Sequence, residues 1–273
     1  MEPKLVIVHE TSDVNELAIE NVSELEEIFV QSGDIVKGGQ QDRVLAVDLI
    51  LPARSGRLPI SAFCIENFRW EQRGTEQVDR FSSSEPMVAT RSLKLATKPG
   101  ASQSRVWDEV EIAQEKLSAG VNEDVSSGLS PSSLQLSLEN QKVQESAATY
   151  IDKLSAIVEG TPDAIGFILA INNKLNSADV YSSSAMFKRF WPKLLRTSAI
   201  EAVAERRLSE ESEPASISAA GEFLVEAEQG EESFKEVTTR THMIKREAIT
   251  AVFFETRDMD HSGVWIHRSY LKK

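Results

Sequence analysis

The chain has 273 residues, of which 41% are hydrophobic and 27% charged, and its formal net charge is −13. This balance is that of a globular protein with a hydrophobic core and argues against a disordered chain. A strongly acidic chain repels phosphate groups, so we expect no general binding to nucleic acid or to an anionic membrane.

The single cysteine, Cys64, excludes a disulfide within the chain and a cysteine-rich metal site. The apolar run at residues 5–8 is too short for a signal peptide, and no later run reaches membrane-spanning length. We therefore expect a cytoplasmic protein.

The first 70 residues predict a series of short β-strands. Residues 44–51 and 59–68 are rich in β-branched and other apolar residues and show no helical stripe. Shorter β-prone segments occur at 5–8, 17–20 and 28–31. Short strands at close spacing indicate an antiparallel, sandwich-like layer. The polar residues 71–85 predict an exposed loop.

The middle of the chain changes to helical spacing. Apolar residues recur every three or four positions over 104–118, which predicts a helix that ends before Gly120. A second helix is expected over 138–158, before Gly160 and Pro162.

A hairpin and a third helix follow. Residues 164–171 predict a buried strand, and Asn172-Asn173 suits a tight turn because asparagine tolerates positive φ. The return strand is expected over 175–181. The apolar stripe of the next helix consists of Phe187, Phe190, Trp191, Leu194 and Leu195.

The last part of the chain predicts strands again. Residues 209–221 are acidic and contain Pro214, which indicates a flexible linker before C-terminal strands over 222–271. Those strands are expected at 223–227, 234–241, 248–256 and 264–270. We expect them to return to the first sheet. The fold class is therefore α+β, with a sandwich-like antiparallel layer from the N- and C-terminal strands, a helical middle segment, and one domain over 1–273.

Several motifs together resemble a known family. Residues 38–43 read Gly-Gly-Gln-Gln-Asp-Arg and precede a strand and Pro52, and residues 59–70 read PISAFCIENFRW. Similar support comes from SRVW at 104–107 and from WPKLL within 166–202. On these motifs the chain resembles the bacterial ARG and rhodanese-phosphatase-superfamily-associated protein domain family over roughly residues 14–205.

The resemblance implies no established reaction, cofactor or catalytic residue, so we expect no cofactor. The family's name gives an associational hint toward stress or defence biology. Asn67-Phe68 stands where a glycine is more usual, and we expect the local turn to differ there.

The first candidate site is the turn formed by Gly38, Gly39, Gln40 and Arg43. Paired glycines let the backbone approach another group closely, and Arg43 offers a planar fork for a carboxylate or phosphate. The alternative is a glycine turn between two strands, whose Arg43 pairs with Glu66 or another acid. The pattern is neither a P-loop nor a dinucleotide fingerprint.

The second candidate lies in the next signature, at Cys64, Glu66, Arg69 and Trp70. Alternate residues of a strand share one face, so a carboxylate and an aromatic wall could form a ligand platform. Equally, Cys64 could pack as a small hydrophobic residue, with Glu66 bound to Arg43. A thiol nucleophile would need an adjacent base.

Two further acidic candidates occur later in the chain. Asp179 could pair with Glu66 for acid–base hydrolysis, or it could support the hairpin in which it lies. Residues 258–261, Asp-Met-Asp-His, could bind a divalent metal together with His267, but they also fit an ordinary hairpin loop. We favour the loop and expect no metal.

Two functions follow from these candidates. The first is a ligand-binding or protein-interaction domain that recognises a small molecule or a protein, in bacterial stress or defence regulation. The second is a hydrolase for a small phosphorylated or nucleotide-like compound, in which Arg43 holds the anion and Glu66 or Asp179 is the base. The hydrolase requires these groups to converge on one pocket. The oligomeric state does not follow from the sequence.

Overall fold

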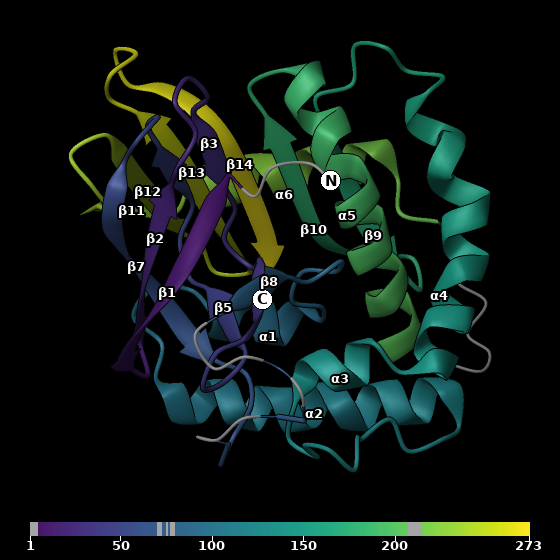
Figure 1. Ribbon diagram of the computed structural model, residues 1–273. Coiled ribbons are helices and arrows are strands. Elements are labelled where there is room, and N and C mark those ends of the chain that lie inside the picture. Colours follow the sequence, from purple (N-terminus) through teal and green to yellow (C-terminus); the bar gives the residue numbers. More distant parts are fainter. Residues whose placement is uncertain (1–4, 70–72, 75, 77–79, 207–213) are drawn as a thin grey trace. The chain divides into compact units, whose positions relative to one another are not determined.

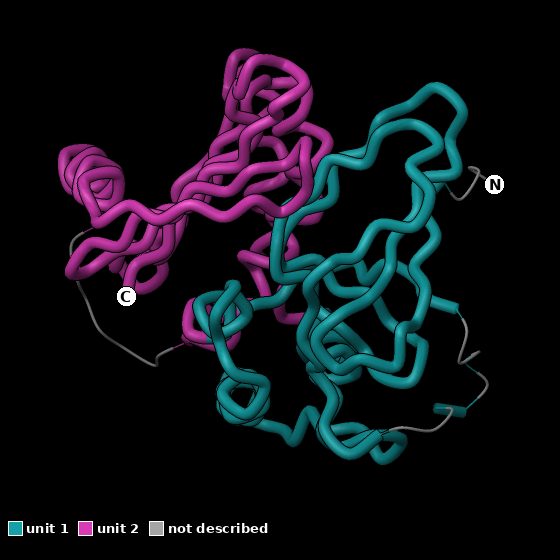
Figure 2. Tube along the Cα trace, turned by 90° about the vertical axis from the view of Figure 1, so that its left-hand side faces the viewer, with its two compact units in different colours: residues 1–89, 93–144 teal, residues 90–92, 145–273 magenta. Residues whose placement is uncertain are grey.

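The computed structural model describes residues 5–69, 73–74, 76, 80–206 and 214–273. The fold is mixed α+β, with antiparallel sheets toward both ends of the chain and helices between them in sequence (Figure 1). The chain divides into two compact units, residues 1–89 with 93–144 and residues 90–92 with 145–273 (Figure 2). One domain over the whole chain stays a prediction.

The first unit contains the N-terminal strands that the sequence predicts. Its main sheet has the order β1-β2-β7-β5-β4-β8 and is antiparallel throughout. The strands are β1 (Val6–Asp13), β2 (Glu16–Asn21), β4 (Ile35–Gly38), β5 (Arg43–Leu45), β7 (Gly56–Cys64) and β8 (Phe81–Ser83). The short strands β3 (Ile28–Val30) and β6 (Leu49–Leu51) pair separately. Alternation sets the core face, since Leu17 and Ile19 of β2 are both buried.

The helix predicted over 104–118 is confirmed as α2 (Gln103–Val121), but Gly120 does not end it, because the helix continues to Val121. The Ser102 hydroxyl accepts the Arg105 N–H at its start, and Asn122 ends it in the left-handed conformation, with φ 56°. The Gln103 side chain binds the backbone at the end of β7. Its amide donates to the Cys64 carbonyl at 2.7 Å and accepts from the Cys64 N–H at 2.9 Å.

The single helix expected over 138–158 is wrong. That stretch holds the end of α3 (Leu134–Leu138), then α4 (Gln141–Leu154) and a 3-10 turn, η1 (Ser155–Val158). The break has a local cause, because the Asn140 side chain accepts the Lys142 N–H at 2.9 Å and so begins a new helix. The sequence also gave no indication of the short helix α1 (Arg91–Ala96) or of β8 within the expected loop.

The second unit is built on a six-stranded sheet of order β11-β12-β13-β14-β10-β9. Its strands are β9 (Gly166–Ile171), β10 (Lys174–Tyr181), β11 (Glu231–Glu236), β12 (Thr241–Glu247), β13 (Ala251–Asp258) and β14 (Val264–Lys272). The predicted hairpin is confirmed, with Asn172 and Asn173 at φ 49° and 61°. Its first strand, expected to be buried, is at the edge of the sheet as β9 and is only partly buried. The C-terminal strands pair with this hairpin through β14 and β10, so the expectation that they join the first sheet is wrong for the described strands.

Two helices belong to this sheet. Helix α5 (Ser184–Ala204) lies along β9 and β10, and its Phe187 is buried as the apolar stripe predicts. Residues 223–227, expected as a strand, lie in α6 (Ile217–Glu228), and so do residues 217–221 of the expected linker. Residues 209–213 of that linker lie outside the described residues. Phe223 and Ala227 are one helical turn apart, and both pack into the core formed with Ala251, Phe253 and Tyr270.

Candidate functional site

The turn at Gly38 and Gly39 can be made only by glycine. Their φ angles are 112° and 58°, in the region that L-residues rarely adopt. A methyl group on Gly38 would collide with the carbonyl oxygen of Arg80, and one on Gly39 would collide with the ring of Phe81. The paired glycines therefore bring backbone close to backbone and ring, within the first unit.

Asp42 lies at the centre of this turn, and sequence reasoning missed it. Its Oδ1 accepts the Gly38 N–H at 2.9 Å, and its own N–H donates to Glu66 Oε2 at 3.2 Å. The Asp42 and Glu66 side chains are fully buried. Two buried carboxylates at one place require cationic partners.

Arg73 is the first of these partners and was also missed. Its Nη1 donates to Asp42 Oδ2 at 2.6 Å, and the same nitrogen lies 3.3 Å from Glu66 Oε1. Ser133, which caps α3, donates to Asp42 Oδ2 at 3.1 Å. Glu76 accepts from Arg73 Nε and Nη2 at 3.1 and 2.9 Å. Arg73 thus joins both buried acids to a third carboxylate.

Arg69 completes the contacts of Glu66. Its Nε lies 2.7 Å from Glu66 Oε2, and its Nη1 donates to the Gly39 carbonyl at 3.2 Å. Both carboxylate oxygens of Glu66 therefore have cationic partners, Arg73 at Oε1 and Arg69 at Oε2.

Arg43 is fully buried and has a different acid partner. Its Nη2 lies 3.8 Å from Glu10 Oε1, and its Nη1 donates to the carbonyl of Gln41 at 3.1 Å. Glu10 also accepts the Gln40 N–H at 3.2 Å. Arg43 was expected to pair with Glu66 or with another acid, and the structure shows that its partner is Glu10. We call Asp42, Glu66, Arg43, Arg69 and Arg73 the charge cluster.

Burial controls the ionisation of the groups in this region. Burial raises the pKa of Asp42 above its usual range, and the hydrogen bond from Arg73 opposes that rise. Burial also raises the pKa of the Cys64 thiol to about 11, and the thiol donates to the Glu66 carbonyl at 2.6 Å. At neutral pH Cys64 is therefore a protonated, buried thiol and not a nucleophile.

The charge cluster is arranged as internal architecture. Its carboxylates are bound by guanidinium groups of the same unit, which leaves Glu66 poorly suited to act as a base. Trp70, which completes the predicted set, lies outside the described residues.

Asp179 belongs to the second unit. Its Oδ1 lies 3.1 Å from Nε2 of His267, whose ring stacks on Tyr181 with a centroid distance of 4.7 Å. These contacts join β10 to β14, in keeping with a supporting role in the hairpin.

The Asp258 loop is held by an ion pair. Arg240 donates to both oxygens of Asp258, at 2.9 and 2.7 Å, and this bond lowers the pKa of Asp258 to about 2. His261 Nδ1 lies 2.8 Å from Oδ2 of the same carboxylate. Within the described ranges no group of three or more His, Cys, Asp or Glu side chains could hold a metal ion.

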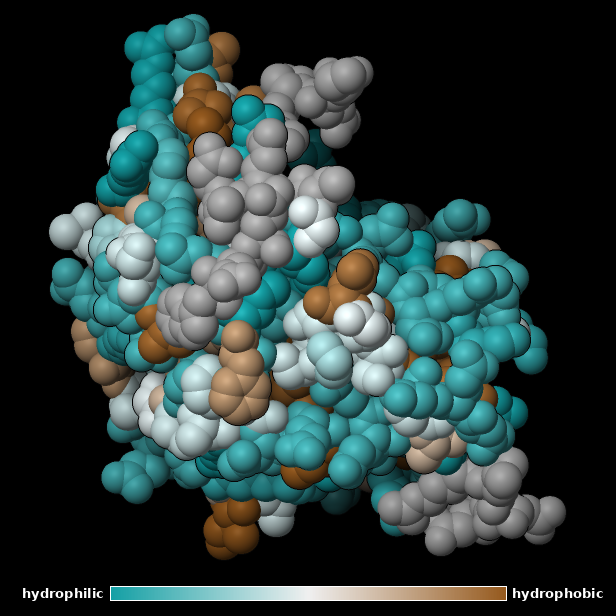
Figure 3. Space-filling model, turned by 60° about the horizontal axis from the view of Figure 1, so that its bottom comes forward, coloured by the Kyte–Doolittle hydropathy of each residue, from teal (hydrophilic) through white to brown (hydrophobic). Residues whose placement is uncertain are grey.

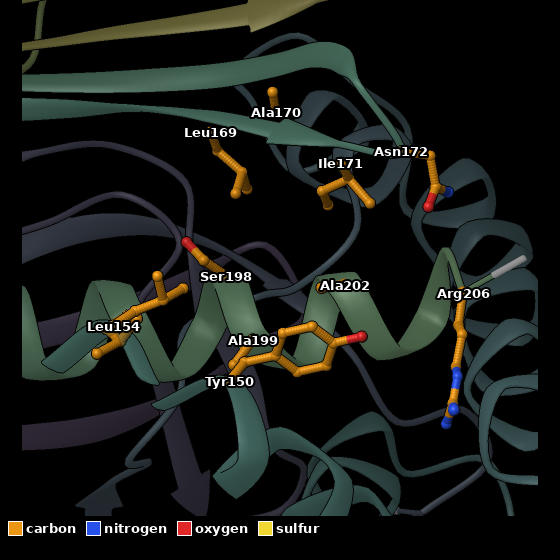
Figure 4. A pocket seen from close by; sticks show the side chains of 11 residues that line it. Tyr150, Leu154, Leu169, Ala170, Ile171, Asn172, Ser198, Ala199, Ala202 and Arg206 are labelled. Carbon is orange, nitrogen blue, oxygen red and sulfur yellow. The ribbon is translucent and has the colours of Figure 1, made fainter. Parts of the chain in front are cut away.

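A cavity of about 330 Å³ opens in the second unit between β9, α5 and the end of α4 (Figure 4). Asn172 and Arg206 lie toward one end of it, and Leu154 and Leu169 lie toward the other. Tyr150 lies between them, with its hydroxyl directed toward the Arg206 end. Its remaining lining residues are Ala170, Ile171, Leu195, Ser198, Ala199 and Ala202. Sequence reasoning missed this cavity, since no motif marks it.

The fold and these sites define an acidic α+β protein with antiparallel sheets toward both ends of its chain. The profile of the ARG and Rhodanese-Phosphatase-superfamily-associated Protein domain matches residues 1–271, and the chain belongs to this family. Neither a curated protein nor a solved structure matches the chain significantly. None of the described helices combines the length and the apolarity needed to cross a bilayer.

Proposed function

We propose that this protein is a non-enzymatic ligand-binding module, and that it binds a small molecule in the cavity between α4, β9 and α5. The observation that carries this proposal is the cavity itself, with a volume of about 330 Å³ and a largely apolar lining. Small-molecule sites typically have volumes of about 300–1,000 Å³, apolar walls and a few polar groups that fix orientation.

The cavity lies where small side chains of α5 face larger side chains of β9. Ala199 and Ala202 are three residues apart on α5 and lie on one face of that helix. Across from them, Leu169 and Ile171 extend from β9 toward α5 (Figure 4). The side wall is Tyr150 and Leu154, one turn apart on α4.

The wall is fixed to the rest of the second unit. The Trp191 indole of α5 donates to the Ser155 carbonyl of η1 at 3.4 Å, directly after α4 ends. Trp191 in turn packs edge-on against Phe167 of β9, with a centroid distance of 5.6 Å. One aromatic residue of α5 thus contacts both β9 and the turn that directly follows α4, which supports a preformed site.

The charge cluster favours binding over hydrolysis as the function. A hydrolase built on Arg43 and Glu66 needs both groups to reach a substrate, yet both side chains are fully buried. Moreover, Arg69 and Arg73 already bind the Glu66 carboxylate.

One face of the molecule shows, among its described residues, no large hydrophobic patch that would suit a protein partner (Figure 3). The face shown in Figure 3 is mostly hydrophilic, and its hydrophobic areas are small and separated. Single exposed hydrophobic residues are normal on a soluble surface and do not indicate an interface. A regulatory role in bacterial stress or defence is part of this proposal and rests on the family's name alone.

A thermal-shift screen tests the proposal. The panel holds nucleotides, sugar phosphates, amino acids and small carboxylates, and it is run on the wild type, on Ala202→Leu and on Ala185→Leu. Ala202→Leu fills the cavity, whereas Ala185 is exposed near the start of α5 and serves as the matched control.

We expect at least one compound to stabilise the wild type and the control but not Ala202→Leu. A ligand at one hundred times its dissociation constant raises the free energy of unfolding by about 2.7 kcal/mol. The proposal is overturned if no compound stabilises the wild type, or if the stabilisation survives in Ala202→Leu.

A further inference from the structure

We infer that the cavity of the second unit takes a small amphipathic carboxylate, with its apolar body between α5 and β9 and its carboxylate at Arg206. This inference rests on the proposed function and adds the chemical class of the ligand. The arrangement of the cavity carries it, because Asn172 and Arg206 lie at one end and Leu154 and Leu169 lie toward the other (Figure 4).

The apolar end sets the body of the ligand. Leu154 and Leu169 line this end, and Ala199 forms the floor on α5. Ser198 adds one hydroxyl group among them. An aliphatic chain or an aromatic ring would bury its surface here, and a body with several polar groups would leave them unpaired.

The polar end sets the head group. Arg206 lies two residues beyond the end of α5, and its side chain is exposed at the edge of the cavity. A guanidinium presents paired N–H donors that match the two oxygens of a carboxylate. The Tyr150 hydroxyl points toward the same end and supplies a further donor (Figure 4).

The charge of the protein makes the local cation necessary for an anionic ligand. With a formal net charge of −13, the chain as a whole repels anions. A carboxylate would therefore depend on Arg206 for attraction at short range, and we expect its affinity to fall as salt is added.

Arg206 also lies where a cation can stabilise helix α5. A cation just beyond the C-terminus of a helix offsets the negative end of the helix dipole. That role affects the stability of α5 and does not distinguish a charged ligand from a neutral one, so the experiment compares two such ligands.

The test is titration calorimetry with two matched pairs of probes: hexanoate against hexanamide, and phenylacetate against phenylacetamide. Each amide keeps the body of its acid and removes the charge. The proteins are the wild type, Arg206→Gln, Tyr150→Phe and Arg189→Gln. Arg189 is exposed on α5 and does not line the cavity, so its replacement is the matched control.

In the wild type we expect at least one acid to bind about tenfold more tightly than its amide, as a charge-assisted hydrogen bond provides. Arg206→Gln should bring this ratio close to one while the amide still binds, and Arg189→Gln should leave the ratio unchanged. Tyr150→Phe should weaken acid binding by about fivefold, the effect of one neutral hydrogen bond.

The inference is overturned if no acid binds more tightly than its amide, or if the preference persists in Arg206→Gln. Either result leaves the proposed function standing when other compounds still bind and Ala202→Leu still abolishes that binding. Failure of the whole panel in the thermal-shift screen would remove the proposed function as well.

Discussion

The charge cluster of the first unit and the cavity of the second unit are opposite in polarity and in accessibility. The cluster gathers two carboxylates and three guanidinium groups at a glycine turn, and its Asp42, Glu66 and Arg43 are fully buried. The cavity is lined mostly by apolar side chains, and a cation lies at its edge. The cluster contains the residues that most resemble a reactive site in the sequence, yet its carboxylates are bound by Arg69 and Arg73, and its Arg43 pairs with Glu10.

A charged side chain that is already bound by oppositely charged partners is not available to a substrate. A buried acid with two guanidinium partners stabilises the fold only as part of its set, because removing one partner leaves an unpaired buried charge. An empty volume between alanine and leucine side chains has no internal partner and is therefore open to a ligand.

The largest effect is expected from Arg73→Met. This change leaves Asp42 and Glu66 without the guanidinium that joins them, and breaking a buried ion pair from one side costs about 3–5 kcal/mol. We expect the free energy of unfolding, measured by urea denaturation at pH 7, to fall by this amount. The loss should be smaller at pH 4, because burial raises the pKa of Asp42 and its carboxylate is then neutralised more readily by acid.

The control for Arg73 is Arg54→Met. Arg54 also forms an ion pair, with Glu24 at 2.7 Å, but both side chains are largely exposed. A surface pair of this kind contributes less than about 1 kcal/mol. Equal losses in the two variants would mean that the charge cluster does not stabilise the first unit.

A smaller loss is expected from Gly38→Ala. The left-handed backbone costs about 1–2 kcal/mol for a residue with a side chain, and the collision with the Arg80 carbonyl adds about 1–3 kcal/mol of overpacking. Gly56→Ala is the matched control, since Gly56 also has a positive φ, 63°, but open space around it. If both variants lose the same stability in thermal melts, the close approach at Gly38 contributes nothing.

Much of the fold could be predicted because its signals are local. The turn at Asn172 and Asn173 depends on two residues that tolerate positive φ, and α2 depends on its own apolar spacing. The turn between β11 and β12 was missed because residues 237–240 contain neither glycine nor proline. It is held instead by the Thr238 hydroxyl, which accepts the Thr241 N–H at 2.9 Å.

The sites were harder to predict because they depend on distant partners. The glycine turn and Glu66 could be singled out from the sequence, but Arg73 reaches Asp42 across 31 positions. No local pattern specifies that choice of partner. The cavity depends on small side chains at Ala199 and Ala202, and their effect appears only once β9 and α4 are placed around α5.

The smallest loss in the free energy of unfolding is expected from Asp258→Asn. The second unit also contains a buried ion pair, Arg240 with Asp258, so buried pairing should stabilise this unit as well. Because Arg240 lowers the pKa of Asp258 to about 2, the folded state favours the ionised form. The resulting stability, about 2 kcal/mol, is present above the unfolded pKa of about 3.9 and is lost as the pH falls toward 2.

We therefore expect the wild type to exceed Asp258→Asn in free energy of unfolding by about 2 kcal/mol at pH 6, with the difference shrinking from pH 5 downward. Urea denaturation over this pH range measures it, and Asp163→Asn, at an exposed position of the same unit, is the control. A difference that stays constant with pH would mean that Asp258 acts through packing and not through its charge. Stabilisation by a buried ion pair would then be a property of the charge cluster and not of the second unit.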